Sequence, residues 1–250
     1  MPGRSIPLSV PRRLMCDYLA LCRGIPLIPM QRTMQLAELV AARNWLGDNR
    51  PSWVAIFLKA YGQVCSRHPE LRTTFMPRPW GHLYEHPEPV AVLAVERQMN
   101  GENAVLPAQM RDPGSRSLNE INAYVQRCKE APLDEIRGYR RALRLSRYPW
   151  IARAMLYELS RWCGAQRSVY LGTFGIGVTA SHGASTLAVV APLTTTLHYG
   201  EFAADGSLPM RLTFDHRVID GAFVARVLTE FEEVLLTDIL SEVRAARQVA

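Results

Sequence analysis

The chain has 250 residues, 48% of them apolar, which is enough to bury one large core, and we interpret it as a single domain over 1–250. Its formal net charge of +6 comes almost entirely from arginine, because Lys59 and Lys129 are its lysines, and this balance favours anionic partners. The arginines are mostly interspersed with acids, and neither zinc-finger spacing nor a basic stripe with interleaved aromatics is present, so nucleic acid is not an expected partner.

Cysteine usage and hydropathy narrow the expected location. The five cysteines are odd in number and widely spaced without a C-x-x-C pair, which predicts neither a disulfide framework nor a metal site. The N-terminal segment lacks a signal-peptide core, and no run of about eighteen uncharged apolar residues occurs. We therefore expect a cytoplasmic protein that binds no metal and does not span a membrane.

Helical spacing of apolar residues and well-placed breakers divide the first part of the chain. We expect a short helix over 11–23, a strand over 28–34, and a helix over 36–48 with a glycine near its end. The segment 52–71 predicts a second strong helix, which Pro69 ends.

The rest of the chain mixes helices and strands without a regular β-α-β alternation. The expected elements are strand-like and turn-rich segments over 71–110, of which 86–98 is the clearest, a helix over 118–131, strands over 170–202, a turn over 204–207, a strand over 208–214 and a closing helix over 222–246. This pattern predicts an α+β domain built around one large sheet.

The stretch LTFDHRVIDGAFVARVL, residues 212–228, places a histidine between two acids, four residues before an Asp-Gly pair. A purely structural interpretation makes Asp220 a helix N-cap, Gly221 a turn residue and His216 a strand-end side chain with a local hydrogen bond. A catalytic interpretation uses the imidazole as a base, because its ordinary pKa lies near working pH.

Other segments decide between these interpretations. The stretch 212–228 resembles the C-terminal motif of the dihydrolipoyl acyltransferase components of 2-oxo acid dehydrogenase complexes. RRLMCDYLALCRGIP, SWVAIFLKAYGQVCSRHPEL, SLNEINAYVQRCKEA and GTFGIGV resemble further segments of the same family, in the family's order. The resemblance implies a chloramphenicol acetyltransferase-like α+β fold, with a mixed central sheet flanked by helices.

By this resemblance, His216 is the general base that takes a proton from the attacking thiol, hydroxyl or amine. Asp220 has a mainly structural role, held by an arginine that fixes the loop, and Arg12 and Arg13 are the candidate partners. Gly221 fits a position where the backbone passes close to another element.

One position departs from the family. Where the family places a Ser or Thr hydroxyl to stabilise the oxyanion, this chain has Gly177. Thr179 or Ser181, or a water molecule, is the candidate replacement, while the plainer interpretation makes both residues ordinary parts of a strand and turn. His182 and His198 lie in no segment that resembles the family's histidine motif, so we expect surface or core roles for them rather than catalysis.

In the family, a lipoyl group is attached to a lysine in a separate hairpin domain. Neither Lys59 nor Lys129 lies in a segment that resembles this hairpin. We therefore expect no covalent lipoyl group. The expected acyl donor is therefore coenzyme A in its acyl form, or a lipoyl or carrier-protein domain acting in trans. The resemblance further implies a homotrimer or a multiple of three, with active sites between subunits. The alternative is a non-catalytic scaffold or assembly protein that keeps the fold and lacks the oxyanion donor at Gly177.

A basic segment over about 133–167 occupies a place where the family has a shorter link, and we interpret it as an amphipathic helical insertion. The apolar stripe comprises Trp150, Ile151, Ala154, Met155, Leu159 and Trp162, and arginines dominate the remainder. The interpretation we favour is that the stripe covers the core while the arginines face water. The alternatives are peripheral contact with an anionic membrane through 137–167, or a lid over an acyl channel.

Overall fold

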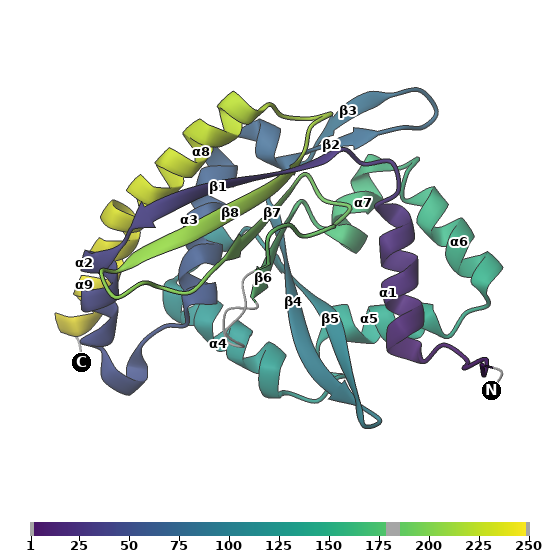
Figure 1. The fold of residues 1–250 in the computed structure, drawn as a ribbon, viewed down its shortest axis with the longest axis horizontal. Helices are drawn as coiled ribbons and strands as arrows, with labels where there is room; N and C mark the ends of the chain where they lie inside the picture. The colour runs from purple at the N-terminus through teal and green to yellow at the C-terminus, as the bar shows by residue number, and fades with distance from the viewer. Residues whose placement is uncertain (1–2, 179–185, 249–250) are drawn as a thin grey trace.

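A six-stranded mixed sheet forms the centre of the molecule in a computed structural model that describes residues 3–178 and 186–248 (Figure 1). Its strand order is β1-β8-β7-β6-β4-β5, in which β6 is parallel to both neighbours and the other pairs are antiparallel. The strands are β1 (Leu27–Gln35), β4 (Val90–Met99), β5 (Glu102–Arg111), β6 (Phe174–Val178), β7 (Thr195–Tyr199) and β8 (Ser207–Asp215), with a separate hairpin of β2 (Thr73–Met76) and β3 (His82–Glu85).

Two groups of helices lie at opposite ends of Figure 1, where the two termini also lie. The first group is α2 (Ala37–Asn44), α3 (Trp53–Arg67), α4 (Leu118–Glu130), α8 (Gly221–Val234), the π-helical η5 (Leu235–Ile239) and α9 (Leu240–Gln248). The second group is α1 (Val10–Leu21), α5 (Arg137–Ser146), α6 (Trp150–Leu159) and α7 (Gly164–Leu171). Short 3₁₀ turns are η1 (Gly47–Asn49), η2 (Pro69–Arg72) and η3 (Pro113–Ser115). No helix within the described ranges combines the length and apolar character needed to cross a bilayer.

Helix α3 is the centre of the hydrophobic core. Ser52 caps its first turn by accepting a hydrogen bond from the Ala55 amide, and the helix stops just before Pro69. A run of its residues is buried on every side, as expected of a helix enclosed by other elements. A Cβ at Gly62 would lie 2.7 Å from the Gly114 amide nitrogen, so only glycine allows η3 to pack this closely.

Strand β8 carries the histidine motif to the edge of the core. It pairs with β1 on one side, where Leu27 faces Asp215, and with β7 on the other, where Thr195 faces Phe214. The strand ends at Asp215 and α8 begins at Gly221, so the residues between them form a tight connection at the end of the sheet.

The predicted α+β class and mixed sheet are confirmed, and most helices begin and end near the expected residues. Helix α4, expected over 118–131, starts with a capping box between Ser117 and Glu120. The strands expected from residue 170 begin later, because residues up to Leu171 belong to α7 and Gly172, with φ 83°, ends that helix. The closing helix is interrupted by the π-helical η5.

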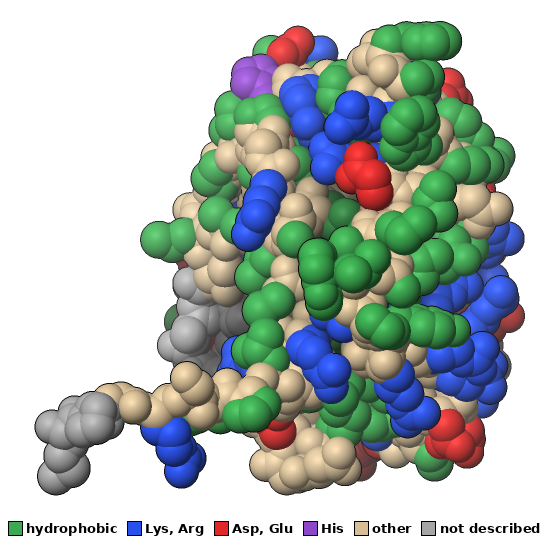
Figure 2. Space-filling view, turned by 90° about the vertical axis from the view of Figure 1, so that its right-hand side faces the viewer, with side chains coloured by type: hydrophobic (Ala, Val, Ile, Leu, Met, Phe, Trp, Pro, Cys, Tyr) green, Lys and Arg blue, Asp and Glu red, His purple; other side chains and the backbone are tan. Residues whose placement is uncertain are grey.

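The apolar stripe of the basic segment points away from the core, so the orientation we favoured from the sequence is wrong. Trp150 is 71% exposed, and Met155 and Leu159 are also exposed. The buried face of α6 instead carries Arg153, whose Nε lies 2.6 Å from the Oδ2 atom of Asp17 on α1. In Figure 2, which looks at the end of the molecule where α1 and α6 lie, hydrophobic side chains form a broad exposed band.

Candidate active site

His216 is the first residue after β8, and its backbone is held between both neighbouring segments. Its amide donates to the carbonyl oxygen of Pro26 at 3.1 Å, just before β1 begins. The amides of Val218 and Ile219 donate back to the carbonyl oxygen of Asp215, which closes the turn. The position of the histidine is therefore fixed by the sheet rather than by a loose loop.

The imidazole of His216 has a defined proton arrangement. Its Nδ1 atom lies 3.1 Å from the carbonyl oxygen of Ile219, and because a carbonyl oxygen can only accept, Nδ1 must donate. The neutral ring then carries a free lone pair on Nε2. The side chain is 44% exposed, so a reactant can approach the ring. Asp220 Oδ1 lies 3.4 Å from Nδ1, where its charge would stabilise the protonated ring.

Asp215, rather than Asp220, is the acid that an arginine holds. Arg217 donates to the Asp215 carboxylate through Nε at 2.9 Å and Nη2 at 2.6 Å, and its amide donates to the same group at 3.0 Å. The carboxylate is nearly inaccessible, and the guanidinium carbon lies 4.5 Å from the centre of the Phe75 ring. This fork locks the turn that presents His216.

The arginine predicted to hold Asp220 is not found in the described structure. Asp220 is 83% exposed and pairs with His216, while Arg12 pairs with Glu102 at 3.6 Å. The buried Nε atom of Arg13 has no hydrogen-bond partner within the described ranges. Sequence reasoning overlooked Arg217, although an acid and an arginine two residues apart at a strand end were a usable signal.

Gly221 lies close to β1, in keeping with the close approach that the resemblance implies. A Cβ at this position would lie 3.3 Å from the Cε atom of Met30, a tight contact that a flexible methionine can relieve. Asp220 is the N-cap residue of α8 by position and has extended backbone angles, yet its side chain makes no capping hydrogen bond. The carboxylate is thus available to the imidazole beside it.

Gly177 and His216 lie far apart within one subunit. In the sheet register, Gly177 on β6 is the partner of His198 on β7, and His198 is the partner of Arg211 on β8. Arg211 lies five residues before His216. At about 3.3 Å per residue along a strand and about 4.8 Å between neighbouring strands, five residues and two strand spacings separate the two positions by roughly 19 Å. One subunit alone therefore does not bring the base and this backbone position together.

The surroundings of Gly177 are open in the described structure. A Cβ built there meets no described atom within 4 Å. The neighbouring His198 is buried and burial lowers its pKa, so it stays neutral, with Nε2 3.4 Å from the carbonyl oxygen of Leu187. The candidates Thr179 and Ser181, together with His182, lie outside the described residues.

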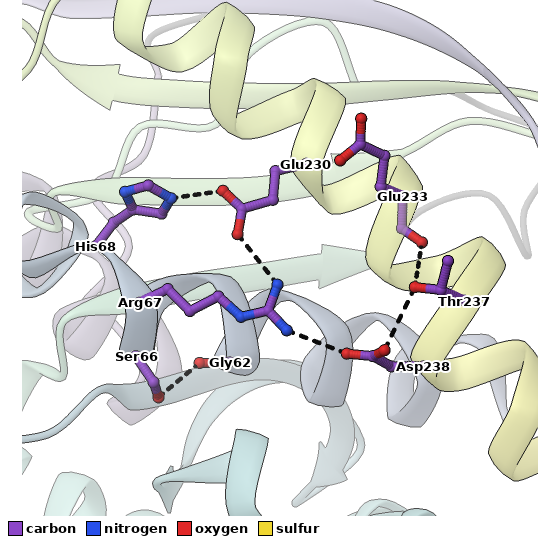
Figure 3. Close-up of polar contacts among 8 residues, drawn as sticks. All are labelled: Gly62, Ser66, Arg67, His68, Glu230, Glu233, Thr237 and Asp238. Carbon is purple, nitrogen blue, oxygen red and sulfur yellow. Dashed lines mark hydrogen bonds and ion pairs between the residues drawn. The ribbon is translucent and has the colours of Figure 1, made fainter.

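A charged cluster behind the motif fixes α8 against α3 (Figure 3). His68 Nε2 lies 2.5 Å from Glu230 Oε2, and Arg67 bridges Glu230 at 3.2 Å and Asp238 at 3.1 Å. The His68 ring also meets Phe223 edge to face, with centroids 5.6 Å apart. These contacts hold the helix that starts at the His216 turn, which gives the cluster a supporting role.

Comparison with known proteins bears on the same region. The sequence profile of the family described as "2-oxoacid dehydrogenases acyltransferase (catalytic domain)" matches residues 186–240, which include the His216 turn. No curated protein matches the sequence.

Solved structures match over nearly the whole chain. The dihydrolipoamide acetyltransferase of Azotobacter vinelandii superposes with a TM-score of 0.66 at 19% identity, covering 97% of this chain and 94% of its own. The cubic core of the pyruvate dehydrogenase multienzyme complex gives 0.64 at 19% identity, with 97% and 94% covered. A chloramphenicol acetyltransferase gives 0.54 at 14% identity, with 88% and 94% covered. The chloramphenicol acetyltransferase-like fold is therefore confirmed, and the matched family and the first and third of these neighbours are described as acyltransferases.

Proposed function

We propose that the protein is an acyltransferase that moves an acyl group from a thioester, in the simplest case acyl-coenzyme A, to a nucleophilic acceptor. The observation that carries this proposal is the hydrogen bond from His216 Nδ1 to the Ile219 carbonyl, which fixes the ring so that the Nε2 lone pair of the neutral imidazole is free to accept a proton. A scaffold protein has little physical need for a histidine oriented in this way. The match of residues 186–240 to an acyltransferase profile supports the same assignment.

In the proposed reaction, Nε2 of His216 takes the proton from the acceptor's hydroxyl, thiol or amine as that atom attacks the thioester carbonyl carbon. The carbonyl oxygen becomes an oxyanion in the tetrahedral intermediate. When the intermediate collapses, the carbon–sulfur bond breaks and the departing thiolate takes the proton back from the imidazolium. Asp220 Oδ1, 3.4 Å from Nδ1, stabilises the ring while it is charged.

The site lacks one group that this reaction needs, a side-chain donor at position 177 that stabilises the oxyanion. Gly177 offers no side-chain donor where the family has a hydroxyl, and loss of one such donor costs about a hundredfold or more in rate. We propose Thr179 or Ser181 as the replacement donor. The rival proposal, a non-catalytic assembly protein, takes Gly177 as the mark of lost activity, and a third has a lipoyl domain in trans as the acyl donor.

The test measures free thiol released from a panel of acyl-coenzyme A donors and simple acceptors. Wild-type protein is expected to release thiol, and Gly177→Ser is expected to release it about tenfold or more faster, because the serine adds an oxyanion donor at the position where the family has its hydroxyl. The substitution is sterically mild, since an added Cβ meets no described atom within 4 Å.

Gly175→Ser is the matched control on the same strand, where a Cβ would lie 2.9 Å from Leu193 Cδ1 and no gain in rate is expected. If neither wild type nor Gly177→Ser released thiol from any donor, and a reduced lipoyl domain accepted no acyl group, the scaffold proposal would replace the enzyme.

We propose that the active protein is a homotrimer or a multiple of three. Since Gly177 and His216 lie roughly 19 Å apart in one subunit, a site that uses both positions needs a second copy of the chain. The solved cubic core that shares this fold supports threefold assembly. Light scattering at micromolar concentration is expected to give three times the 28.1 kDa chain mass, or a multiple of that value. A stable monomer would contradict it.

We also propose a cytoplasmic location. All five cysteines are free thiols, and Cys16 and Cys163 are exposed. Exposed unpaired thiols suit a reducing compartment.

A further inference from the structure

Helix α6 presents an apolar face to the outside. Five large hydrophobic side chains on α6 and one just beyond its end are exposed. They are Trp150, Ile151, Met155, Leu156, Leu159 and, beyond the helix, Trp162. Figure 2 shows the exposed hydrophobic band on the end of the molecule where α1 and α6 lie. A continuous exposed apolar band of this kind marks an interaction surface.

The outward orientation is fixed by the polar face of α6. Arg153 is buried and donates to Asp17 through Nε at 2.6 Å, and to the Tyr148 carbonyl oxygen through Nη1 at 2.8 Å. Turning the helix to bury Trp150 would bring this arginine out and leave Asp17 unpaired. The apolar face is therefore held outward by a specific ion pair.

Helix α5 supplies a cluster of arginines beside this face. Arg137, Arg140, Arg141 and Arg144 follow helical spacing and line a cavity of about 270 Å³. Within the described residues, Arg137, Arg140 and Arg144 make no ion pair. Arg141 lies 4.8 Å from the Tyr170 ring centre, and burial, with Arg137 nearby, lowers its pKa. Guanidinium groups gathered without carboxylates are complementary to an anionic partner.

The arginine cluster and the apolar face belong to one surface. Three residues, Arg147 to Pro149, join α5 to α6, so the two helices form a hairpin. In Figure 2, Lys and Arg side chains gather along the lower right side of the hydrophobic band, with few acidic side chains among them. A larger cleft of about 880 Å³ shares Arg137 and Arg141 and adds Arg111, Arg116 and Arg127.

We propose that the α5–α6 hairpin is a docking surface for an anionic phospholipid bilayer. The apolar face carries Trp150 and Trp162 near its two ends, with Tyr148 beside it, and these side chains favour the boundary between headgroups and acyl chains. The arginines of α5 would contact the lipid phosphates while their stems lie along apolar surface. The surface would lie in the interface without crossing the bilayer.

Charge argues against a twofold pairing of two copies of the chain through this face. A symmetric pairing through this face would bring two unpaired arginine clusters together, in a chain of net charge +6. An anionic bilayer neutralises the same groups. This inference goes beyond acyl transfer and stands whether or not the protein has that activity.

The test is co-sedimentation with vesicles, in the absence of acyl donor and acceptor. Wild-type protein is expected to bind vesicles of phosphatidylcholine mixed with phosphatidylglycerol, and not pure phosphatidylcholine vesicles. Arg140→Gln with Arg144→Gln is expected to weaken binding about twenty-five-fold, since each arginine near an anionic surface contributes about a factor of five. Trp150→Ser is expected to weaken it roughly tenfold through lost apolar burial.

Matched controls lie elsewhere on the surface. Arg50→Gln with Arg226→Gln removes two exposed arginines outside the hairpin, and Trp80→Ser removes a tryptophan that is 74% exposed, against 71% for Trp150. Both controls are expected to bind the mixed vesicles as wild type does.

Each of several results would overturn the proposal. No vesicle binding by wild type would do so, as would hairpin variants that bind like the controls. Binding of inorganic tripolyphosphate without vesicle binding would assign the arginines to a free phosphate ligand. A fall in oligomer mass on Trp150→Ser, without vesicles, would assign the face to another copy of the chain.

Discussion

His216→Ala is expected to lower thiol release from acyl-coenzyme A by between about a hundredfold and ten-thousandfold, which is the usual contribution of a general base. The side chain is 44% exposed and lies outside the core, so the thermal unfolding midpoint is expected to stay close to that of wild type. The reason for the loss is specific. Nε2 holds the only imidazole lone pair left free by the hydrogen bond from Nδ1 to Ile219.

His82→Ala is the matched control for this prediction. Its Nδ1 also lies against a backbone carbonyl oxygen, that of Trp80, at 2.9 Å, but it belongs to the β2–β3 hairpin outside the motif. The control is expected to release thiol at the wild-type rate. Equal rates for His216→Ala and wild type would reject His216 as the base, whatever donor proves best.

Much of the fold follows from local signals. Helices α3 and α4 are predictable because a capping serine, an apolar pattern and a helix stop agree with one another in each. The His216 turn is predictable because its residues are contiguous in the chain. The orientation of α6 is not, because its pattern offers two possible buried faces, and the choice depends on Asp17 at a distant position in the sequence.

The candidate site is likewise predictable only where it depends on contiguous residues. The motif 212–228 predicts His216 as the base from sequence alone, yet the partner of each neighbouring acid depends on which way its side chain turns at the end of β8. Asp215 turns inward and meets Arg217, while Asp220 turns outward and meets His216. The separation between Gly177 and His216 depends on strand register, which a single sequence does not specify.

Asp220→Ala and Asp215→Ala are therefore expected to differ sharply in stability, and Asp215→Ala is expected to be the less stable of the two. Asp220 is 83% exposed, so its removal is expected to change the free energy of unfolding by less than about 1 kcal/mol and to act mainly on turnover.

Asp215→Ala is expected to lower the free energy of unfolding by about 3 kcal/mol, because it leaves the Arg217 guanidinium beside the core without its carboxylate. Thiol release should fall as well, since the fork fixes the turn that presents His216. Urea unfolding at one fixed protein concentration measures the loss. Removing the charge with Arg217→Met in the Asp215→Ala background is expected to restore part of it, because no unpaired guanidinium then remains. An Asp215→Ala variant as stable as wild type would show that the fork does not hold the turn.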